Sequence, residues 1–232
     1  MSRIKVNSII DPSKSYEYID DGSPKQGGVK DVYFSPDRKY VVAFYREKNP
    51  APTQMERQQQ KERIIKICTQ YHNNIKGGTV PSYWLDEIYR WPTDAVEKNN
   101  RLGIIVPLYL SKYFFSKGYK ANDMIKGGEK VGKWFTAPSF RNTQYPLSLD
   151  KSELGDWLSY FQIGINISRG VKKMHQMGLA HSDLSYNNVL VDPVTKSASI
   201  IDIDGLVVPG LFPPDVIGTA DFIAPEVLST KH

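Results

Sequence analysis

The stretch HSDLSYNNVLVD at 181–192 decides the interpretation of this 232-residue chain. Asp183 and Asn188 stand five residues apart in it, and the strand-like run VLV follows them. The segment SIIDIDG at 199–205 then brings a second carboxylate, Asp202, next to a turn that contains glycine. Polar loops at the edge of strands place such side chains in a cleft. A base, an amide and a second acid on one site suit metal-assisted phosphoryl transfer, because Mg²⁺ prefers hard oxygen ligands.

Three segments in order resemble the signature motifs of eukaryotic-like protein kinases. HSDLSYNNVL is similar to the catalytic loop H-R-D-x-x-x-x-N, and IIDIDG at 200–205 is similar to the metal-binding D-F-G segment. GTADFIAPE at 218–226 resembles the end of the activation segment, which closes with A-P-E. Because all three occur in the order of that family, the sequence is identified as a member of the eukaryotic-like protein kinase superfamily.

The resemblance implies an α+β, bilobal kinase-like fold. Residues 1–107 would form an N-terminal lobe, an antiparallel sheet with a helix that binds the nucleotide. Residues 108–232 would form a mostly helical C-terminal lobe with the catalytic loop and the activation segment. The chain ends six residues after Glu226, so we expect a truncated C-terminal lobe whose exposed apolar area favours association.

Secondary-structure signals in the first part of the chain agree with a sheet and a helix. Residues 27–47 are typical of strand, turn and strand around SPDR at 35–38. Thr53 and Glu56 form a capping-box signature for a following helix. The apolar face of that helix is expected to hold Ile64, Ile65, Ile67, Cys68 and Tyr71.

Further elements are expected along the rest of the chain. Strands are predicted around Tyr83–Tyr89 and at 102–106, and residues 111–150 are interpreted as an insert or elaborated connection. A long helix should start near Leu154 and be capped by Gly178. Its apolar pattern runs through Leu158, Phe161, Ile165, Val171 and Met174.

Carried over position by position, the resemblance implies roles for residues of the C-terminal part. Asp183 would be catalytic, accepting the proton of the substrate hydroxyl or orienting that hydroxyl. Asn188 and Asp202 would be the metal ligands that hold Mg²⁺ against the phosphates of ATP. His181 would pack the loop against the metal-binding segment, and Thr219 would line the substrate side.

The nucleotide-binding half departs from the family. Where G-x-G-x-x-G-x-V is expected, the chain has KQGGVKDV at 25–32, in which Gly27 falls on a patterned glycine and Val32 on the valine that covers adenine. Tyr45 stands where V-A-x-K requires the phosphate-binding lysine. Lys30 occupies the third-glycine position, which supplies this lysine in the with-no-lysine kinases. We therefore expect Lys30 to neutralise the phosphates; the alternative is a solvated loop lysine.

Residues from both expected lobes would bind ATP. The adenine would lie between Val32 and Ala43 on one side and the other lobe, with the hinge backbone near Pro107–Tyr109. The full expected set is Gly27, Gly28, Lys30, Val32, Ala43, Pro107, Leu108, Tyr109, Asn188 and Asp202. The acid that pairs with the lysine in the family stays unassigned, because Glu56 is used by its cap and Glu62 falls opposite the apolar face.

Three further positions depart from the kinase motifs. Ser182 replaces the arginine that receives an activation-loop phosphate, so activation by loop phosphorylation is disfavoured. Ser185 stands where serine/threonine kinases carry a lysine, and Asp204 replaces the glycine of D-F-G. These variants resemble bacterial eukaryotic-like kinases of tellurite-resistance-associated clusters. That resemblance implies a phosphatase and a von Willebrand A-domain protein as partners beside the protein substrate.

Composition limits the other classes of function. The formal net charge is +5, without a run of five like charges or an aromatic–basic array for nucleic acid. The apolar stretch at 103–110 is less than half of the roughly 20 residues that a spanning helix needs, so no membrane partner is expected. Cys68 is the single cysteine and excludes an internal disulfide, which together with the absence of a signal peptide indicates a cytoplasmic protein.

The sequence therefore predicts an ATP- and Mg²⁺-dependent serine/threonine protein kinase, which could also phosphorylate itself. A pseudokinase, acting as a nucleotide-binding scaffold, is the first alternative, since Tyr45 and Ser185 depart from the motifs. A small-molecule kinase is the second. The segment at 218–226 argues against it, because small-molecule kinases generally lack an activation segment that ends in A-P-E.

Overall fold

The computed structural model describes residues 2–26, 28–47, 51–77, 80–117, 125–136, 149–208, 210–211, 218–219, 221–223 and 225. The chain forms two compact units, and each is described by itself. Unit 1 comprises Met1–Gly78, Trp91–Leu108 and Val208–Pro213. Unit 2 comprises Thr79–Arg90, Tyr109–Val207 and Pro214–His232.

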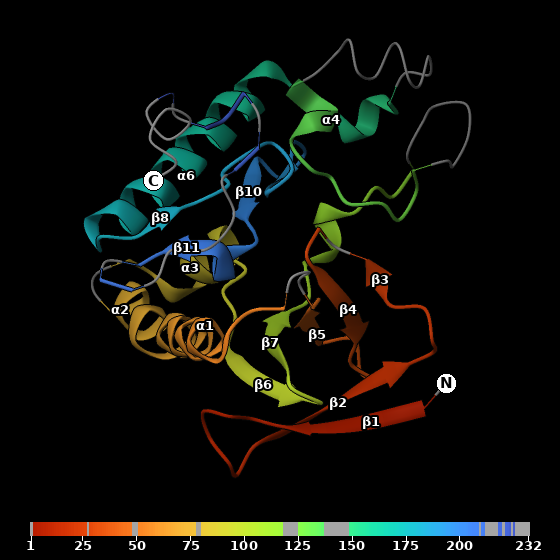
Figure 1. Cartoon of the computed structure of the whole chain (residues 1–232). Helices are drawn as coiled ribbons and strands as arrows, with labels where there is room; N and C mark the ends of the chain where they lie inside the picture. Colours follow the sequence, from red (N-terminus) through yellow and green to blue (C-terminus); the bar gives the residue numbers. More distant parts are fainter. Residues whose placement is uncertain are drawn as a thin grey trace. The chain divides into compact units, whose positions relative to one another are not determined.

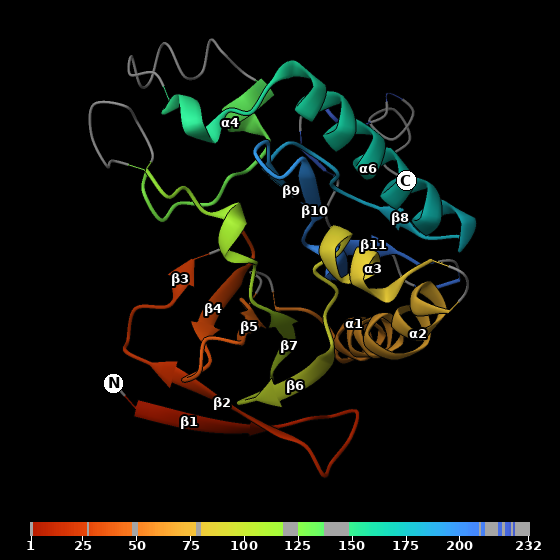
Figure 2. The same cartoon turned by 180° about the vertical axis from the view of Figure 1, so that it is seen from behind.

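Unit 1 is built on a five-stranded antiparallel sheet with the order β3-β4-β5-β7-β6 (Figures 1 and 2). Its strands are β3 (Lys25–Gln26), β4 (Lys30–Phe34), β5 (Tyr40–Tyr45), β6 (Asp94–Lys98) and β7 (Arg101–Pro107). In the turn between β4 and β5, the Ser35 hydroxyl donates to Asp37 and accepts from the amides of Lys39 and Tyr40. The strands predicted on both sides of the SPDR turn and at 102–106 are therefore confirmed.

A two-stranded hairpin, which the sequence did not reveal, precedes this sheet. β1 (Ser2–Asn7) and β2 (Ser15–Asp20) pair antiparallel and pack against β6 and β4. The contact is fixed by the buried Asp94 carboxylate, which accepts from Ser8 Oγ at 2.7 Å and from the Tyr16 hydroxyl at 2.7 Å. Burial and this hydrogen bond raise the pKa of Tyr16, so its hydroxyl keeps the proton that it donates.

The core of unit 1 lies between the hairpin and the sheet. Val42, Phe44 and Ile105 from the sheet pack with Val6 and Tyr18 from the hairpin. Because side chains alternate along a strand, the neighbouring positions of β4 and β5 face the other side of the sheet.

Helix α1 (Gln54–Lys66) begins at the predicted capping box. Thr53 Oγ1 accepts from the Glu56 amide at 3.2 Å, and the Glu56 carboxylate accepts from the Thr53 amide at 2.7 Å. The helix continues into the π-helix η1 (Ile67–Tyr71) and α2 (His72–Lys76). The reciprocal cap satisfies two amides that would otherwise lack partners, which fixes where the helix starts.

The buried face of this helical stretch agrees in part with the prediction. Ile64, Ile67 and Cys68 are buried as expected. Ile65 and Tyr71 are half-buried, because they lie at the margins of the face.

Unit 2 combines helices with short strands. The helices are α3 (Ser82–Ile88), η2 (Ser111–Tyr113), α4 (Lys133–Thr136), η3 (Lys151–Glu153), α6 (Trp157–Gln176) and η4 (Ile203–Gly205), and the strands are β8 (Ala180–His181), β9 (Val189–Asp192), β10 (Ser197–Ile200) and β11 (Leu206–Val207). β9 pairs with β10 and β8 pairs with β11, both antiparallel. Together with the sheet of unit 1, these elements confirm the α+β class.

The strand predicted around Tyr83–Tyr89 is wrong, because most of this stretch forms α3. Leu85 and Ile88 are its buried positions, and a spacing of three places them on one face of a helix but on opposite faces of a strand. Tyr89, which follows the helix, is extended and bridges to Ile200 of β10. The helix α3 packs against β10, which tertiary context can favour over local strand propensity.

The long helix expected between Leu154 and Gly178 is confirmed as α6. Asp156 caps its start by accepting from the Ser159 amide at 2.8 Å, and the Ser159 hydroxyl donates back to Asp156. At the other end Gly178 has a φ of 72°, the left-handed conformation that favours glycine after a helix.

The apolar pattern that predicted α6 agrees with its buried face at Met174, whereas Leu158, Phe161 and Ile165 of that pattern are exposed. Gly170 and Met174 are buried, and a Cβ at Gly170 would lie 2.9 Å from Ile88 Cγ1, so α6 approaches α3 closely. The exposed apolar side chains of α6 are Trp157, Leu158, Phe161 and Ile165. Over the described ranges, α6 and the other helices lack the length and apolar character that crossing a membrane requires.

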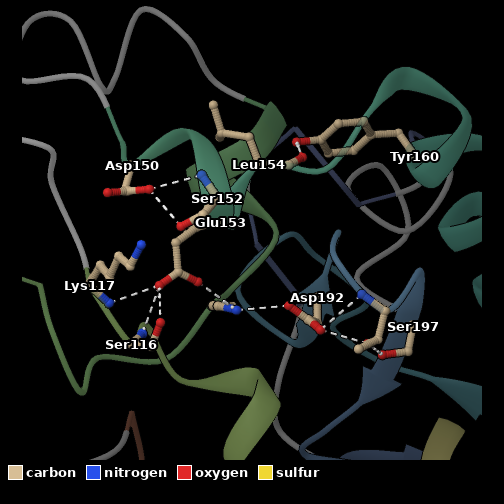
Figure 3. A network of polar contacts seen from close by, with 11 residues as sticks. Ser116, Lys117, Asp150, Ser152, Glu153, Leu154, Tyr160, Asp192 and Ser197 are labelled. Carbon is tan, nitrogen blue, oxygen red and sulfur yellow. Dashed lines mark hydrogen bonds and ion pairs between the residues drawn. The ribbon is translucent and has the colours of Figure 1, made fainter.

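A buried lysine joins the segment after η2 to the β9–β10 hairpin, and Figure 3 labels the two acids that it contacts, Glu153 and Asp192. Lys130 Nζ lies 2.8 Å from Glu153 Oε2 and 2.7 Å from Asp192 Oδ1, and the three side chains are 5%, 3% and 3% exposed. Glu153 Oε1 accepts from the amide and the hydroxyl of Ser116. Asp192 Oδ2 accepts from the amide and the hydroxyl of Thr195. Each carboxylate is therefore satisfied by the ammonium on one oxygen and by a neighbouring loop on the other.

Glu153 should make stability depend on pH in acid. Burial alone would raise the pKa of Glu153, but hydrogen bonds from Lys130 and Ser116 hold it below the ordinary value of 4.5. Since the folded-state pKa is the lower one, the stabilisation is complete above about pH 4.5 and is lost as the pH falls through the folded-state pKa. We expect Glu153→Gln to lower the free energy of unfolding at neutral pH by about 2 kcal/mol and to flatten its acid dependence.

Urea denaturation at a series of pH values measures this difference. Glu62→Gln is the matched control, because Glu62 forms an exposed pair with Lys66 at 3.0 Å and should contribute less than about 1 kcal/mol. Curves of equal slope in acid for wild type and Glu153→Gln would contradict the assignment.

Candidate active site

The loop between β8 and β9 carries the predicted catalytic residues and is fastened at its start. His181 pairs with Leu206 in the β8–β11 ladder, and His181 Nε2 lies 2.8 Å from Ile201 O. The Asp183 amide donates to His181 Nδ1 at 3.2 Å. Nδ1 is therefore unprotonated, and Nε2 carries the proton that is donated to Ile201. The structural role expected for His181, holding the loop against the segment that leads to Asp202, is confirmed.

The Asp183 carboxylate is the hydrogen-bonding centre of the loop. Its Oδ2 accepts from Asn188 Nδ2 at 2.9 Å, and its Oδ1 accepts from the Thr219 amide at 2.7 Å and the Thr219 hydroxyl at 2.6 Å. Asn188 Nδ2 also donates to Asp183 O at 2.7 Å. Because both contacts of this atom are to acceptors, it is the amide nitrogen, which fixes the orientation of the Asn188 side chain. The other amide atom, Oδ1, is then the one that could bind a cation.

Asp202 is brought close to Asn188 by the backbone. The Ile201 amide donates to Asn188 O at 3.0 Å, so Asn188 and Asp202 lie at the same end of the β9–β10 hairpin. Asp202 has φ 57° and ψ 36°, a left-handed conformation that Asp tolerates better than most residues, and the Gly205 amide donates to its carbonyl at 3.1 Å. The structure thus brings Asp183, Asn188 and Asp202 together in unit 2.

The oxygen ligands present fit Mg²⁺ better than a transition metal. Across the part of the chain that the structure describes, His, Cys, Asp and Glu side chains form no group of three that could hold a metal ion. Asn188 and Asp202 offer one amide oxygen and one carboxylate. Mg²⁺ is commonly held by one or two such oxygens together with water and the phosphates of a nucleotide.

The residues that depart from the kinase motifs have local partners. Ser182 Oγ donates to Gly205 O at 2.7 Å, which ties the loop to η4. Ser185 is 2% exposed, and its Oγ accepts from the Asn187 amide at 3.3 Å. Asp204 is buried as well. Serine at 182 and 185 therefore stabilises the loop instead of presenting a positive charge.

The end of the predicted activation segment reaches the same carboxylate. Gly218 has a φ of 104°, and a Cβ there would lie 3.1 Å from Ser182 O, so glycine allows the two segments to approach. Thr219 then places both of its donors on Asp183. Ala224 and Glu226 of the A-P-E sequence lie outside the described residues.

Sequence reasoning missed an aromatic pair beside this loop. The rings of Tyr186 and Phe222 form an edge-to-face pair with centroids 5.0 Å apart, and the side chains are 36% and 47% exposed. The pair joins the catalytic loop to the segment after Thr219. A signal was present in the two motifs, since each carries one aromatic residue, but nothing in the spacing showed that they meet.

In unit 1, the expected phosphate-binding lysine shares one face of the sheet with three other residues. The β4–β5 register pairs Lys30 with Tyr45 and Val32 with Ala43. Alternation places these side chains on the face opposite the core around Phe44. Lys30 is 8% exposed, and its Nζ lies 5.7 Å from the centroid of the Tyr45 ring. Lys30 therefore stands directly across from the position at which the family carries its lysine.

The other expected nucleotide-binding residues are distributed over both units. Gly27 lies outside the described residues, and Gly28 is exposed. Pro107 ends β7, and the Leu108 amide donates back to the turn between β4 and β5 at 2.9 Å. Tyr109 belongs to unit 2, where it packs against a buried cluster.

The acids of α1 that were weighed as partners of the lysine have other contacts. The Glu56 carboxylate accepts from Thr53 in the cap, and Glu62 lies 3.0 Å from Lys66 on the exposed side. The charged residue that α1 buries is Arg63, which is 6% exposed. Sequence reasoning missed Arg63, although its spacing of four from Ile67 could have placed it on the buried face.

No family model matches the chain. A dual serine/threonine and tyrosine protein kinase of Apis mellifera is 32% identical over 76 residues, and proteins of the same name from Xenopus tropicalis and Homo sapiens are 31% and 30% identical over 71 residues. These alignments cover 33%, 31% and 31% of this chain and 8% of each relative. The chain thus spans a small part of the length of the curated relatives that it matches.

A solved structure of the pseudokinase domain of BIR2, an immune regulator of the RLK/Pelle family, is similar with a TM-score of 0.48 and 14% identity. The similarity covers 92% of this chain and 53% of that chain. The kinase motifs, their contacts around Asp183 and the kinases among the sequence relatives together support a protein-kinase-like superfamily for this chain.

Proposed function

We propose that this protein is an ATP- and Mg²⁺-dependent protein kinase that transfers the γ-phosphate to serine or threonine hydroxyls, its own included. The observation that carries the proposal is the Asp183 carboxylate, bonded by Asn188 and by Thr219. Since the sequence relatives are matched over 8% of their length, the activity is proposed from the residues of this chain.

The pattern of bonds on Asp183 supports its role toward the substrate hydroxyl. Oδ1 accepts two hydrogen bonds from Thr219, whereas Oδ2 accepts one from Asn188. A carboxylate oxygen accepts two bonds, so, counting the contacts of the described residues, Oδ2 keeps a place for one further donor. The acceptor hydroxyl would donate there, and Asp183 would orient it and take its proton.

Asn188 Oδ1 and the Asp202 carboxylate would hold Mg²⁺ beside the phosphates. Bound Mg²⁺ would neutralise the charge on the transferred phosphoryl group. Lys30 would neutralise the phosphates from the sheet of unit 1, because the β4–β5 register puts it across from Tyr45. Val32 and Ala43, on the same face of the sheet, would contact the adenine, with Gly27 and Gly28 in the loop above it and Pro107, Leu108 and Tyr109 as the hinge.

The acceptor class is part of this proposal. The sequence relatives are called dual serine/threonine and tyrosine protein kinases, so a tyrosine acceptor is tested beside serine and threonine. The division into lobes at 1–107 and 108–232, the cytoplasmic location and the phosphatase and von Willebrand A-domain partners stay predictions from the resemblance.

A pseudokinase that binds nucleotide as a scaffold is the second candidate. It is favoured by Ser185, which is buried within the loop, and by Tyr45, which offers no cation. A small-molecule kinase is disfavoured by the contact between Thr219 and Asp183. Thr219 lies in the stretch that resembles the end of an activation segment, which small-molecule kinases generally lack.

Asp183→Asn should strongly reduce phosphate transfer. The amide of asparagine keeps the size of the side chain but cannot take a proton, so we expect a loss of at least about 100-fold. The measurement is transfer from labelled ATP with Mg²⁺ to the protein itself and to peptides with serine, threonine or tyrosine. Binding of ATP without transfer by the wild type would instead support the scaffold.

The position of the phosphate-binding lysine can be tested by moving it across the strand pair. Lys30→Met should reduce transfer by at least about 100-fold, since the phosphates lose their cation in a partly desolvated site. In Lys30→Met/Tyr45→Lys the ammonium returns from the neighbouring strand on the same face, and transfer should recover in part. The control is Lys39→Met in the exposed turn between β4 and β5. Wild-type activity in Lys30→Met would show that Lys30 is a solvated loop lysine.

A further inference from the structure

A short segment of the chain adds a second row of backbone hydrogen bonds to β9, on the edge opposite β10. The Val191 amide donates to Lys130 O at 2.8 Å, and the Gly132 amide donates to Val189 O at 2.9 Å, around an antiparallel bridge. β9 therefore has β10 on one edge and the segment 130–132 on the other. This segment lies within the stretch that was interpreted from the sequence as an insert.

The side chain of Lys130 holds this segment in place through two ion pairs. Lys130 places its ammonium between Glu153 and Asp192. Both acids are labelled in Figure 3, and Asp192 is the last residue of β9. The backbone and the side chain of Lys130 thus bind the same strand. Glu153, in turn, accepts from the amides of Ser116 and Lys117, so the lysine joins three parts of unit 2.

The same segment touches the catalytic loop. A Cβ on Gly132 would lie 3.1 Å from Tyr186 O and 3.5 Å from Tyr186 Cα, so the backbone of the segment lies against this part of the loop. Asn188, two residues further on, directly precedes β9. The stretch from Tyr186 to Val189 is therefore bounded by the segment at both of its ends.

A buried ionic cluster contributes little net free energy to folding, because its charges lose their hydration. Burying an ammonium with two carboxylates incurs a desolvation penalty, and apolar residues of similar volume often stabilise a core as well or better. Ionic hydrogen bonds are directional, however, and can fix a register. The benefit of Lys130 would then be the exact placement of the segment on β9.

We propose that Lys130 is a positioning residue for the Mg²⁺–nucleotide site. By holding the segment 130–132 on β9, it fixes the Asn188 amide, and with it the Oδ1 that would face Mg²⁺, relative to Asp202. This inference rests on the proposed function, because it assigns Asn188 and Asp202 to the metal.

Lys130→Met tests the proposal through the metal requirement. The Mg²⁺ concentration for half-maximal phosphate transfer at saturating ATP should rise about tenfold, as for other residues that orient metal ligands. The KM for ATP at saturating Mg²⁺ should change by less than about twofold, since the nucleotide contacts are not altered. Lys172→Met, an exposed lysine of α6, is the matched control and should leave both values unchanged.

Gly132→Ala provides a variant that keeps every charge. Its methyl group would press on the Tyr186 carbonyl from the segment, and we expect the same rise in the required Mg²⁺ concentration with a smaller magnitude. This variant decides the question if Lys130→Met fails to fold. An unchanged Mg²⁺ requirement in folded Gly132→Ala would overturn the proposal in that case.

Hydrogen exchange separates the positioning role from the proposed activity. In Lys130→Met the amides of Gly132 and Val191 should exchange at least about tenfold faster than in the Lys172→Met control. Faster exchange with an unchanged Mg²⁺ requirement would show that Lys130 stabilises the segment without positioning the metal ligands. Unchanged exchange would show that Lys130 does not hold the segment on β9. If the wild type transfers no phosphate, the proposed kinase activity is wrong, but the positioning role of Lys130 can still be tested. The metal requirement is then measured as the Mg²⁺ dependence of binding of a non-hydrolysable ATP analogue.

Discussion

The hydrogen bonds from the Asn188 side chain to Asp183 are the constraint on which the rest of the catalytic loop depends. One nitrogen binds both the carbonyl and the carboxylate of Asp183, which closes the loop into a ring. Every other contact is built on this ring. His181 anchors its start, Ser182 joins it to η4, and Thr219 reaches its carboxylate from a distant part of the chain.

Serine residues take over a structural role in this loop. At 182 and 185 the kinase pattern expects basic side chains, which would project toward phosphate groups. Here the two hydroxyls bond to backbone groups within unit 2 instead. The loop keeps its shape without those charges. Under the proposed function, fewer groups would neutralise the phosphates, and Lys30, a buried cation in the sheet of unit 1, would be one of them.

The local features of the fold could be predicted where a single segment determines them. The Thr53 capping box, the SPDR turn and the ends of α6 follow from short-range chemistry, and all three are confirmed. The strand prediction for 83–89 was wrong. Aromatic residues favour strands locally, but this stretch forms a helix that packs against β10.

In the candidate site, too, local features could be predicted from the sequence and long-range contacts could not. Motif spacing pointed to Asp183, Asn188 and Asp202, which the structure brings together in unit 2. The contact of Tyr186 with Phe222 and the placement of Lys130 depend on chain segments that lie far apart in the sequence, so no local pattern could reveal them. The N-terminal hairpin was missed for a related reason, because its partner Asp94 comes more than seventy residues later.

The contact of the hairpin with Asp94 also bears on where the domain starts. The first recognisable kinase segment is KQGGVKDV at 25–32, so alignment to the family would set the boundary near residue 20. A boundary there would remove both hydroxyls that satisfy the Asp94 carboxylate and would uncover Phe44 and its neighbours. The residues before the first motif are thus an integral layer of unit 1. A fragment designed from motifs alone would begin inside a packed structure.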